Sequence, residues 1–280
     1  ALATNLATIP GLRTSAYVPD DPNPPIAIIE PSEEHYYQPS WTLVGGGAFN
    51  VKNSRRLTKD LIPAGVRWIK EKITGFNPDT NEVLIGDSTP VKYQQLAIAT
   101  GIKSNWDAIP GLKETLGKNG VTSNYSFEYS PYTWELTQGL KSGKAIFTQP
   151  PLPIKCPGAP QKAMYLSCFE WQKQGRLKHI EVELNNAGGA LFGVADFVPP
   201  LMEYVEKYHA KLNFNTNLIS VDGPAKKAVF SVKDADGIKN VYDVLQKAGY
   251  EDVLLVVSAM GKTTNALEIV IKNYFEKSAE

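Results

Sequence analysis

Short apolar strands alternate with helical segments between residues 144 and 215, and this alternation constrains the fold more than any other feature. Strands are predicted at 145–148, 180–184 and 212–215, and helices at 159–174 and 199–211. Strands that are connected through helices run parallel in one sheet, and the helices pack on its faces. The sequence therefore predicts an α/β fold with a mostly parallel sheet.

The region before this alternation is predicted to contain shorter strands. Residues 26–29 and 95–99 have the composition of short buried strands. Residues 67–73 and 82–85 are predicted strands on either side of a turn, because residues 77–81 (NPDTN) are rich in turn-forming Asn, Pro and Asp.

Three further segments complete the expected organisation. Residues 1–25 are rich in Thr, Ala, Pro and Asp and are predicted to form an irregular arm. A helix is predicted at 132–139, with Trp134 and Leu136 buried. The apolar run at 253–257 is predicted to be a core strand.

The composition excludes several classes of function. The chain has 280 residues, enough for one or two domains, and its formal net charge is zero. A neutral chain argues against a nucleic-acid partner, which usually needs a basic surface. We find no apolar run of membrane-spanning length and expect no secretory signal. Two cysteines do not form a disulfide scaffold, and the three histidines lack metal-ligand spacing, so no metal site is predicted.

Cys156 is the candidate catalytic residue, because it lies in the predicted loop just before the helix at 159–174. Pro160 suits the first turn of that helix, where a missing N–H costs nothing. Unpaired N–H groups at the helix start, the positive end of the helix dipole, Lys155 and Lys162 all favour a nearby thiolate. These features predict a reactive thiol. The alternative is a small buried side chain in a tight loop.

Glu30 is the candidate cofactor-binding residue, because it follows the strand at 26–29. In dinucleotide-binding folds, an acidic residue at the end of the second strand accepts hydrogen bonds from the adenosine ribose. The alternative interpretation is a solvated carboxylate at a strand end.

Long segments of the chain resemble the sulfide:quinone oxidoreductase family, from about residue 26 to about residue 230. The resemblance rests on residues 28–47 (IIEPSEEHYYQPSWTLVGGG), 62–69 (IPAGVRWI), 99–101 (ATG), 147–150 (FTQP), 155–162 (KCPGAPQK) and 188–194 (GGALFGV). It implies incomplete FAD/NAD(P)-binding Rossmann-like domains, in which sulfide is oxidised through a cysteine persulfide and FAD, and quinone accepts the electrons. It also implies peripheral attachment to the bacterial plasma membrane or the mitochondrial inner membrane.

The resemblance also assigns roles to individual residues. Cys156 corresponds to the redox cysteine that is the covalent partner in catalysis. Glu30 corresponds to the residue that contacts the FAD ribose, Gln38 to a flavin-nucleotide contact, and Ile73 to the position where the backbone meets the adenine.

Two elements of the family pattern have no counterpart in this sequence. Residues 1–25 contain one glycine, Gly11, where the family has a glycine-rich loop for the pyrophosphate. The run Gly45-Gly46-Gly47 is expected to be a flexible loop, not a substitute. Cys168, which is expected to be packed in a helix, does not replace the family's second redox cysteine. We therefore expect impaired activity and weak FAD binding.

The C-terminal residues 231–280 resemble the N-terminal part of aspartate kinases, through residues 256–267 (VVSAMGKTTNAL). That resemblance makes Thr264 an aspartate-site position. The expected domains are a partial FAD-binding domain at 26–103, a second Rossmann-like domain at 104–230, and this fragment as a short α/β tail. The alternatives are a cofactor-free, non-catalytic α/β module and a chimeric chain with an inactive amino-acid kinase fragment.

Overall fold

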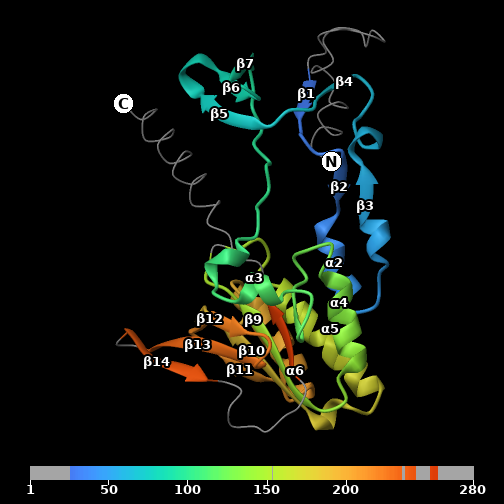
Figure 1. Ribbon diagram of the computed structural model, residues 1–280, viewed down its shortest axis with the longest axis vertical. Coiled ribbons are helices and arrows are strands. Elements are labelled where there is room, and N and C mark those ends of the chain that lie inside the picture. The colour runs from blue at the N-terminus through green and yellow to red at the C-terminus, as the bar shows by residue number, and fades with distance from the viewer. Residues whose placement is uncertain (1–25, 153, 235–236, 244–252, 258–280) are drawn as a thin grey trace. The chain divides into compact units, whose positions relative to one another are not determined.

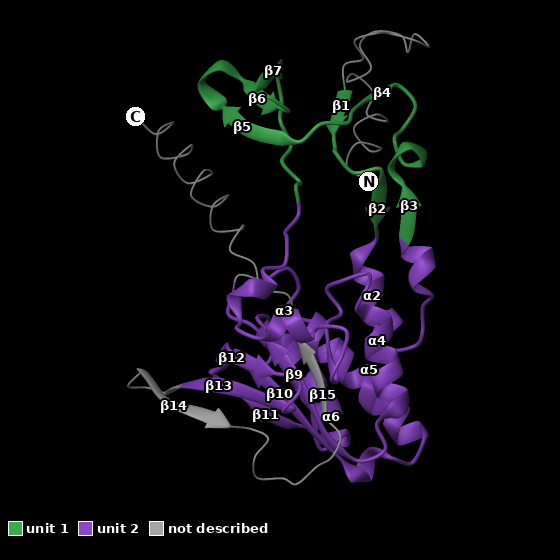
Figure 2. Cartoon of the chain, in the orientation of Figure 1, with its two compact units in different colours: residues 1–36, 55–100 green, residues 37–54, 101–280 purple. Residues whose placement is uncertain are grey.

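The structure is a computed structural model that describes residues 26–152, 154–234, 237–243 and 253–257 (Figure 1). The chain divides into two compact units, coloured separately in Figure 2. Within the described residues, the first unit holds 26–36 and 55–100, and the second holds 37–54 and the described residues from 101 onward. The expected α/β class is confirmed, because the largest sheet is parallel throughout and helices pack against it.

The first unit consists of short strands in three small sheets. In one, β1 (Ile26–Ile29) runs parallel to β4 (Val66–Ile69). In another, β2 (Glu34–Tyr36) pairs antiparallel with β3 (Arg55–Leu57), which leads into the 3-10 turn η3 (Thr58–Asp60). The third is the antiparallel meander β5 (Ile73–Asn77), β6 (Glu82–Ile85) and β7 (Thr89–Lys92). The turn η4 (Pro78–Thr80) joins β5 to β6, as the sequence predicted.

Two strand predictions in this unit are wrong. Residues 67–73 do not form one strand, because β4 pairs with β1 and β5 pairs with β6, so the chain changes sheets between Ile69 and Ile73. Residues 95–99 form no strand, and Leu96 and Ile98 are 36% and 39% exposed. An apolar run becomes a buried strand only where a neighbouring strand and a covering layer are available, and the described sheet of β1 and β4 has two strands.

The second unit is built around a five-stranded parallel sheet. Its strands lie in the order β11 (Lys211–Asn213), β10 (Ile180–Asn186), β9 (Gly143–Gln149), β15 (Val253–Val257) and β8 (Val121–Thr122). Every residue of β9 is buried, as expected for a strand flanked on both sides and covered on both faces. The strand predicted at 253–257 is confirmed as β15, which pairs with both β8 and β9.

Helices cover one face of this sheet. They are α5 (Ala159–Lys173) and α6 (Val198–Lys207), with α4 (Ser130–Gly139) packed beside α5, and the turns η6 (Leu177–His179) and η7 (Ala195–Phe197) precede β10 and α6. Phe147 of β9 and Trp171 of α5 are fully buried in this layer. Each such side chain contributes about 2–3 kcal/mol through burial. The Trp171 indole N–H also donates to the carbonyl of Thr137, 2.8 Å away, which ties α5 to α4.

The opposite face of the sheet is covered by a second, antiparallel sheet. It consists of β12 (Thr216–Asp222), β13 (Lys227–Asp234) and β14 (Gly237–Asp243). Ile146 of β9 packs with Leu218 and Phe230 of this sheet and with α3 (Leu112–Thr115), which follows the turn η5 (Trp106–Ala108). Successive residues of β9 point to opposite faces of the sheet. This strand therefore contributes side chains both to the core beneath the helices and to the core beneath the antiparallel sheet.

The predicted alternation of strands and helices at 144–215 is confirmed, and the largest difference in a boundary concerns the helix predicted at 199–211. The helix predicted at 199–211 ends at Lys207 as α6, and β11 follows after three residues. His209 takes a left-handed backbone conformation with φ of 52°, and the N–H of Ala210 donates to the carbonyl of Val205. A left-handed residue after the last turn stops a helix in this way.

Helix α4 confirms the helix predicted at 132–139, but its buried face differs from the prediction. Thr133 and Thr137 are fully buried, whereas Trp134 and Leu136 are half-buried. The Thr133 hydroxyl lies 2.9 Å from that of Thr122 in β8, so hydrogen bonds accompany this packing.

The run Gly45-Gly46-Gly47 is a close-packing site and not the flexible loop that the sequence suggested. Gly45 ends α2 (Trp41–Gly45), which lies between η1 (Gln38–Ser40) and η2 (Val51–Ser54). A Cβ on Gly47 would lie 2.4 Å from the ring of Trp134 in α4, and one on Gly46 would lie 2.7 Å from Leu166 in α5. Side chains at these positions would push α2 away from both helices.

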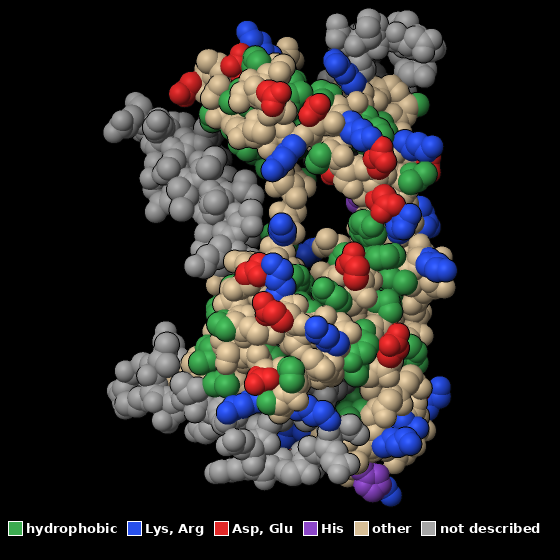
Figure 3. Space-filling view, viewed as in Figure 1, with side chains coloured by type: hydrophobic (Ala, Val, Ile, Leu, Met, Phe, Trp, Pro, Cys, Tyr) green, Lys and Arg blue, Asp and Glu red, His purple; other side chains and the backbone are tan. Residues whose placement is uncertain are grey.

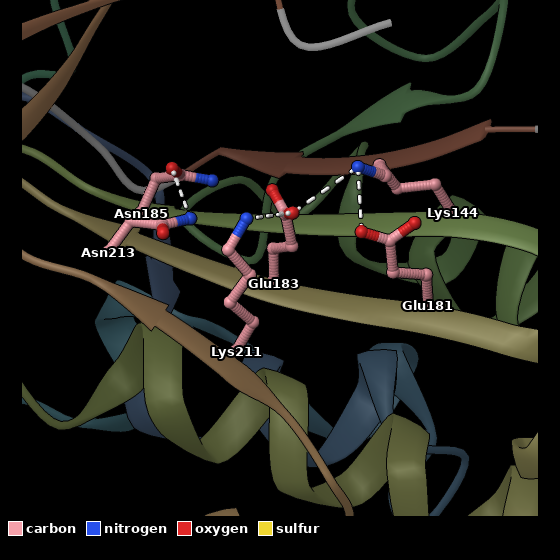
Figure 4. A network of polar contacts seen from close by, with 6 residues as sticks. All are labelled: Lys144, Glu181, Glu183, Asn185, Lys211 and Asn213. Carbon is pink, nitrogen blue, oxygen red and sulfur yellow. Dashed lines mark hydrogen bonds and ion pairs between the residues drawn. The ribbon is translucent and has the colours of Figure 1, made fainter. Parts of the chain in front are cut away.

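A charged network lies on the sheet face that β12 covers (Figure 4). The Lys144 ammonium on β9 is 2.9 Å from the Glu181 carboxylate and 3.2 Å from that of Glu183, both on β10. Lys211 on β11 also binds Glu183, at 3.1 Å. Burial opposes ionisation of Glu183, but the two lysines outweigh it and lower the pKa of its carboxyl. The network links three neighbouring strands.

Candidate active site

Cys156 is exposed in the loop between β9 and α5, where the sequence placed it. Its backbone carbonyl accepts two hydrogen bonds, one from the Tyr125 hydroxyl at 2.9 Å and one from the Ala159 N–H at 3.2 Å. Ala159 is the first residue of α5 and Gly158 precedes it as the N-cap. The backbone of Cys156 is therefore fixed at the start of a helix of fifteen residues.

Three loops at the carboxyl ends of parallel strands surround this position. Tyr125 comes from the loop after β8, Cys156 from the loop after β9, and Leu191 from the loop after β10. Gln161 in the first turns of α5 donates from its side-chain amide to the carbonyl of Leu191. Ligands of open α/β sheets bind at the carboxyl ends of the strands, so Cys156 lies at the edge where chemistry is expected.

The electrostatic surroundings of Cys156 include one close cation. Partial burial lowers the pKa of Lys155, and the neighbouring Cys156 thiolate acts in the opposite direction by attracting the ammonium. Lys162 is exposed one turn into α5. The N–H groups at the start of α5 add a positive potential, which favours negative charge near the helix start.

Cys168 is fully buried in α5, in agreement with the packed position that the sequence predicted. Burial raises the pKa of its thiol. It packs within the helical layer beside Met164 and Trp171. A thiol in such surroundings is protonated and shielded, so Cys168 is unsuited to partner Cys156.

Glu30 directly follows β1, as predicted. Its N–H donates to the carbonyl of Ile69, and its own carbonyl accepts from the Trp68 indole at 2.8 Å. One carboxylate oxygen accepts the N–H of Ser32 at 2.7 Å. The side chain is thus held at the end of a parallel strand, the position that a ribose-binding carboxylate takes.

The other predicted site residues lie in different parts of the structure. Ile73 is the first residue of β5, in the same unit as Glu30. Gln38 is the first residue of η1, in the same unit as Cys156. Thr264 lies outside the described residues, as does most of the segment with aspartate-kinase resemblance.

Tyr125 is a candidate functional residue that the sequence did not reveal. Its N–H donates to the buried Ser123 hydroxyl at 3.2 Å, which fixes the start of the loop after β8. Tyr125 and Cys156 are 31 positions apart, so no local pattern links them. A polar aromatic residue just after a buried strand was the one signal available.

The described residues provide neither a metal centre nor a membrane span. Side chains of His, Cys, Asp and Glu do not gather in groups of three or more suited to a metal ion in this part of the chain. Among the helices described, none combines the length and apolar character that a membrane span needs. On the face in Figure 3, basic side chains are scattered among acidic and apolar ones, so its described part has no continuous basic area.

The described residues form an α/β fold with an exposed thiol at the carboxyl edge of its parallel sheet. The solved structure of the sulfide:quinone oxidoreductase from Aquifex aeolicus is similar to this chain, with a TM-score of 0.64 at 18% sequence identity. The similarity covers 84% of this chain and 52% of that one. At this level of identity, the comparison establishes the fold alone.

Sequence comparison finds relatives with higher identity to this chain. The mitochondrial sulfide:quinone oxidoreductases of Dictyostelium discoideum and Mus musculus are 43% and 40% identical to this chain over 222 residues. Each alignment covers 79% of this chain and 49% of the relative. This chain is therefore homologous to sulfide:quinone oxidoreductases and spans about half the length of these relatives. No protein-family model matches it. These oxidoreductase relatives lend no support to the aspartate-kinase resemblance.

Proposed function

We propose that this chain carries the thiol site of a sulfide:quinone oxidoreductase, with Cys156 as the thiolate that departs when sulfide attacks a disulfide. The observation that supports this most is the exposed Cys156 at the start of α5, with its carbonyl fixed by Tyr125 and Ala159. The names of the relatives give sulfide and quinone as their substrates, and we propose the same two substrates for this chain.

The thiol step can be written with its atoms balanced. In a disulfide between Cys156 and a second thiol, hydrosulfide attacks the sulfur that belongs to the second thiol. A new S–S bond forms to this sulfur, so the second thiol becomes a persulfide, and the original S–S bond to Cys156 breaks. The electron pair of that bond stays on Cys156, which leaves as a thiolate near Lys155 and the N–H groups of α5.

The second thiol is a small thiol in solution. The other cysteine of this sequence is Cys168, whose burial excludes it. When bound, FAD would supply the two-electron acceptor that connects the thiol site to quinone. The protein's own part is to hold the thiolate at the carboxyl edge of the sheet.

Glu30 is the described residue that best fits FAD, because its carboxylate is held at the end of β1. Gln38 and Ile73 are proposed contacts on the basis of the family resemblance. We further propose that FAD is bound weakly, since residues 1–25 contain a single glycine where the pyrophosphate needs a glycine-rich turn. The relatives are mitochondrial proteins, and on the basis of the family resemblance we propose peripheral association with the mitochondrial inner membrane.

The experiment begins with the mixed disulfide of Cys156 and glutathione, made with glutathione disulfide. Sulfide is then added, and the products are trapped with an alkylating reagent and identified by mass spectrometry. The proposal predicts free Cys156 and glutathione persulfide, because the leaving thiolate is stabilised at position 156. A persulfide on Cys156, with glutathione released as the free thiol, would contradict it. The Cys156→Ser variant is the control, since it cannot form the mixed disulfide.

A further inference from the structure

We propose that Tyr125 is a positioning residue for Cys156, which holds the thiol in its reactive placement through the backbone carbonyl. This inference rests on the proposed function, because it explains how the departing thiolate is held. Tyr125 donates its hydroxyl to the Cys156 carbonyl at 2.9 Å, from the loop after a different strand.

The hydrogen bond joins two loops that the sheet brings together at its carboxyl edge. The Tyr125 loop begins at β8, where Ser123 is fully buried and accepts the Tyr125 N–H. The Cys156 loop begins at the end of β9, and the carbonyl of Cys156 also accepts the Ala159 N–H of α5 at 3.2 Å. The tyrosine thus connects the Cys156 loop to a firmly anchored neighbour.

Two donors on one carbonyl have an electrostatic consequence. They hold the negative end of the Cys156 carbonyl toward the hydroxyl and the helix N–H, so that it cannot rotate freely toward a thiolate. The same arrangement keeps residue 156 beside Lys155 and the positive end of α5. Without the Tyr125 hydroxyl, the Cys156 carbonyl keeps the longer hydrogen bond from the Ala159 N–H. The Cys156 loop then gains alternative conformations.

The rate at which iodoacetamide alkylates Cys156 tests this role across a range of pH. The Tyr125→Phe variant should react about fivefold more slowly than the original protein near neutral pH, the factor expected for one lost hydrogen bond. At high pH, the rates of the two proteins should converge. Peptide mass spectrometry follows Cys156 and Cys168 separately, and continued protection of Cys168 shows that the fold is intact.

The matched control is Tyr132→Phe, which loses the hydroxyl that accepts the Gly120 N–H at 3.2 Å, away from the Cys156 loop. In this variant, iodoacetamide should alkylate Cys156 at the same rate as in the original protein. Equal rates for Tyr125→Phe and the original protein at every pH would overturn the proposal, as would an equal slowing by Tyr132→Phe. Because no sulfide is used, failure here is distinguishable from failure of the sulfide reaction with the mixed disulfide.

Discussion

Cys156 is exposed in the loop just before α5, whereas Cys168 is fully buried within that helix. The two thiols therefore serve as a matched pair in one molecule. One can be reached by solvent and reagents, and the other becomes reactive only when the helical layer opens. This contrast makes thiol reactivity a direct test of the site.

The first prediction is that Cys156 is alkylated far faster than Cys168. Burial raises the pKa of the Cys168 thiol and shields it, so its reaction depends on local opening. At neutral pH, we expect a difference of at least about a hundredfold between the two rates. Peptide mass spectrometry after timed alkylation measures both. Similar rates for Cys156 and Cys168 would contradict the buried position of Cys168 in α5.

The second prediction concerns the charge beside the thiol. Lys155→Met should slow alkylation of Cys156 about threefold at neutral pH, because the ammonium attracts the thiolate in a partly exposed loop. The exposed Lys162, one turn further along, serves as the comparison. Lys162→Met should have a smaller effect. High salt should reduce the Lys155 effect, and an effect unchanged by salt would point to a cause other than charge.

The third prediction concerns the network in Figure 4, in which Glu183 is 3% exposed and Lys144 is 8% exposed. Glu183→Gln removes the central carboxylate and should lower the free energy of unfolding by roughly 3 kcal/mol, since among the described residues Lys144 then keeps Glu181 as its single ion-pair partner. The double variant Lys144→Met, Glu183→Leu should lose less than Glu183→Gln alone. Urea unfolding of each variant measures this, and a larger loss in the double variant would contradict the explanation.

The same network predicts a dependence of stability on pH. The pKa of Glu183 is lowered, so its contribution is present above the unfolded pKa and is lost as the pH falls through the folded pKa, below 4.5. Burial opposes the charge of Lys144, but Glu181 and Glu183 outweigh it and raise the pKa. Its contribution is lost as the pH rises above 10.5. In Glu183→Gln, the loss of stability at acid pH should be shallower than in the original protein.

The fourth prediction is that Gly47→Ala destabilises the second unit by about 1–3 kcal/mol. Gly47 has φ of 71°, and an added Cβ would lie 2.4 Å from the Trp134 ring. Gly139→Ala is the control, because a Cβ there meets nothing within 4 Å. Thermal unfolding should show a clear loss for the first variant and little change for the second. Equal behaviour would mean that α2 does not pack closely on α4.

The sequence was informative where local patterns determine structure. The alternation at 144–215 and the loop position of Cys156 follow from apolar periodicity and from Pro160 in the first turn of α5. The strand predicted at 95–99 failed because its burial depends on neighbours that no local pattern specifies. The contact between Tyr125 and Cys156 could not be predicted, since the order of strands in the sheet brings these loops together.

The fifth prediction is that the purified protein carries far less than one FAD per chain. Glu30 offers a ribose contact, but residues 1–25 lack the glycines of a pyrophosphate-binding turn. The visible spectrum and the flavin released on denaturation measure the content. A yield near one flavin per chain would contradict the prediction and would separate the flavoprotein from a cofactor-free α/β module.

The role of Cys156 as the departing thiolate is tested most directly by one rate. The mixed disulfide of Cys156 with glutathione is treated with sulfide at neutral pH, and the appearance of the free Cys156 thiol is followed over time. If Lys155 and the start of α5 stabilise the leaving thiolate, this reaction is faster than that of sulfide with glutathione disulfide under the same conditions. An equal or slower reaction at Cys156 would contradict this role.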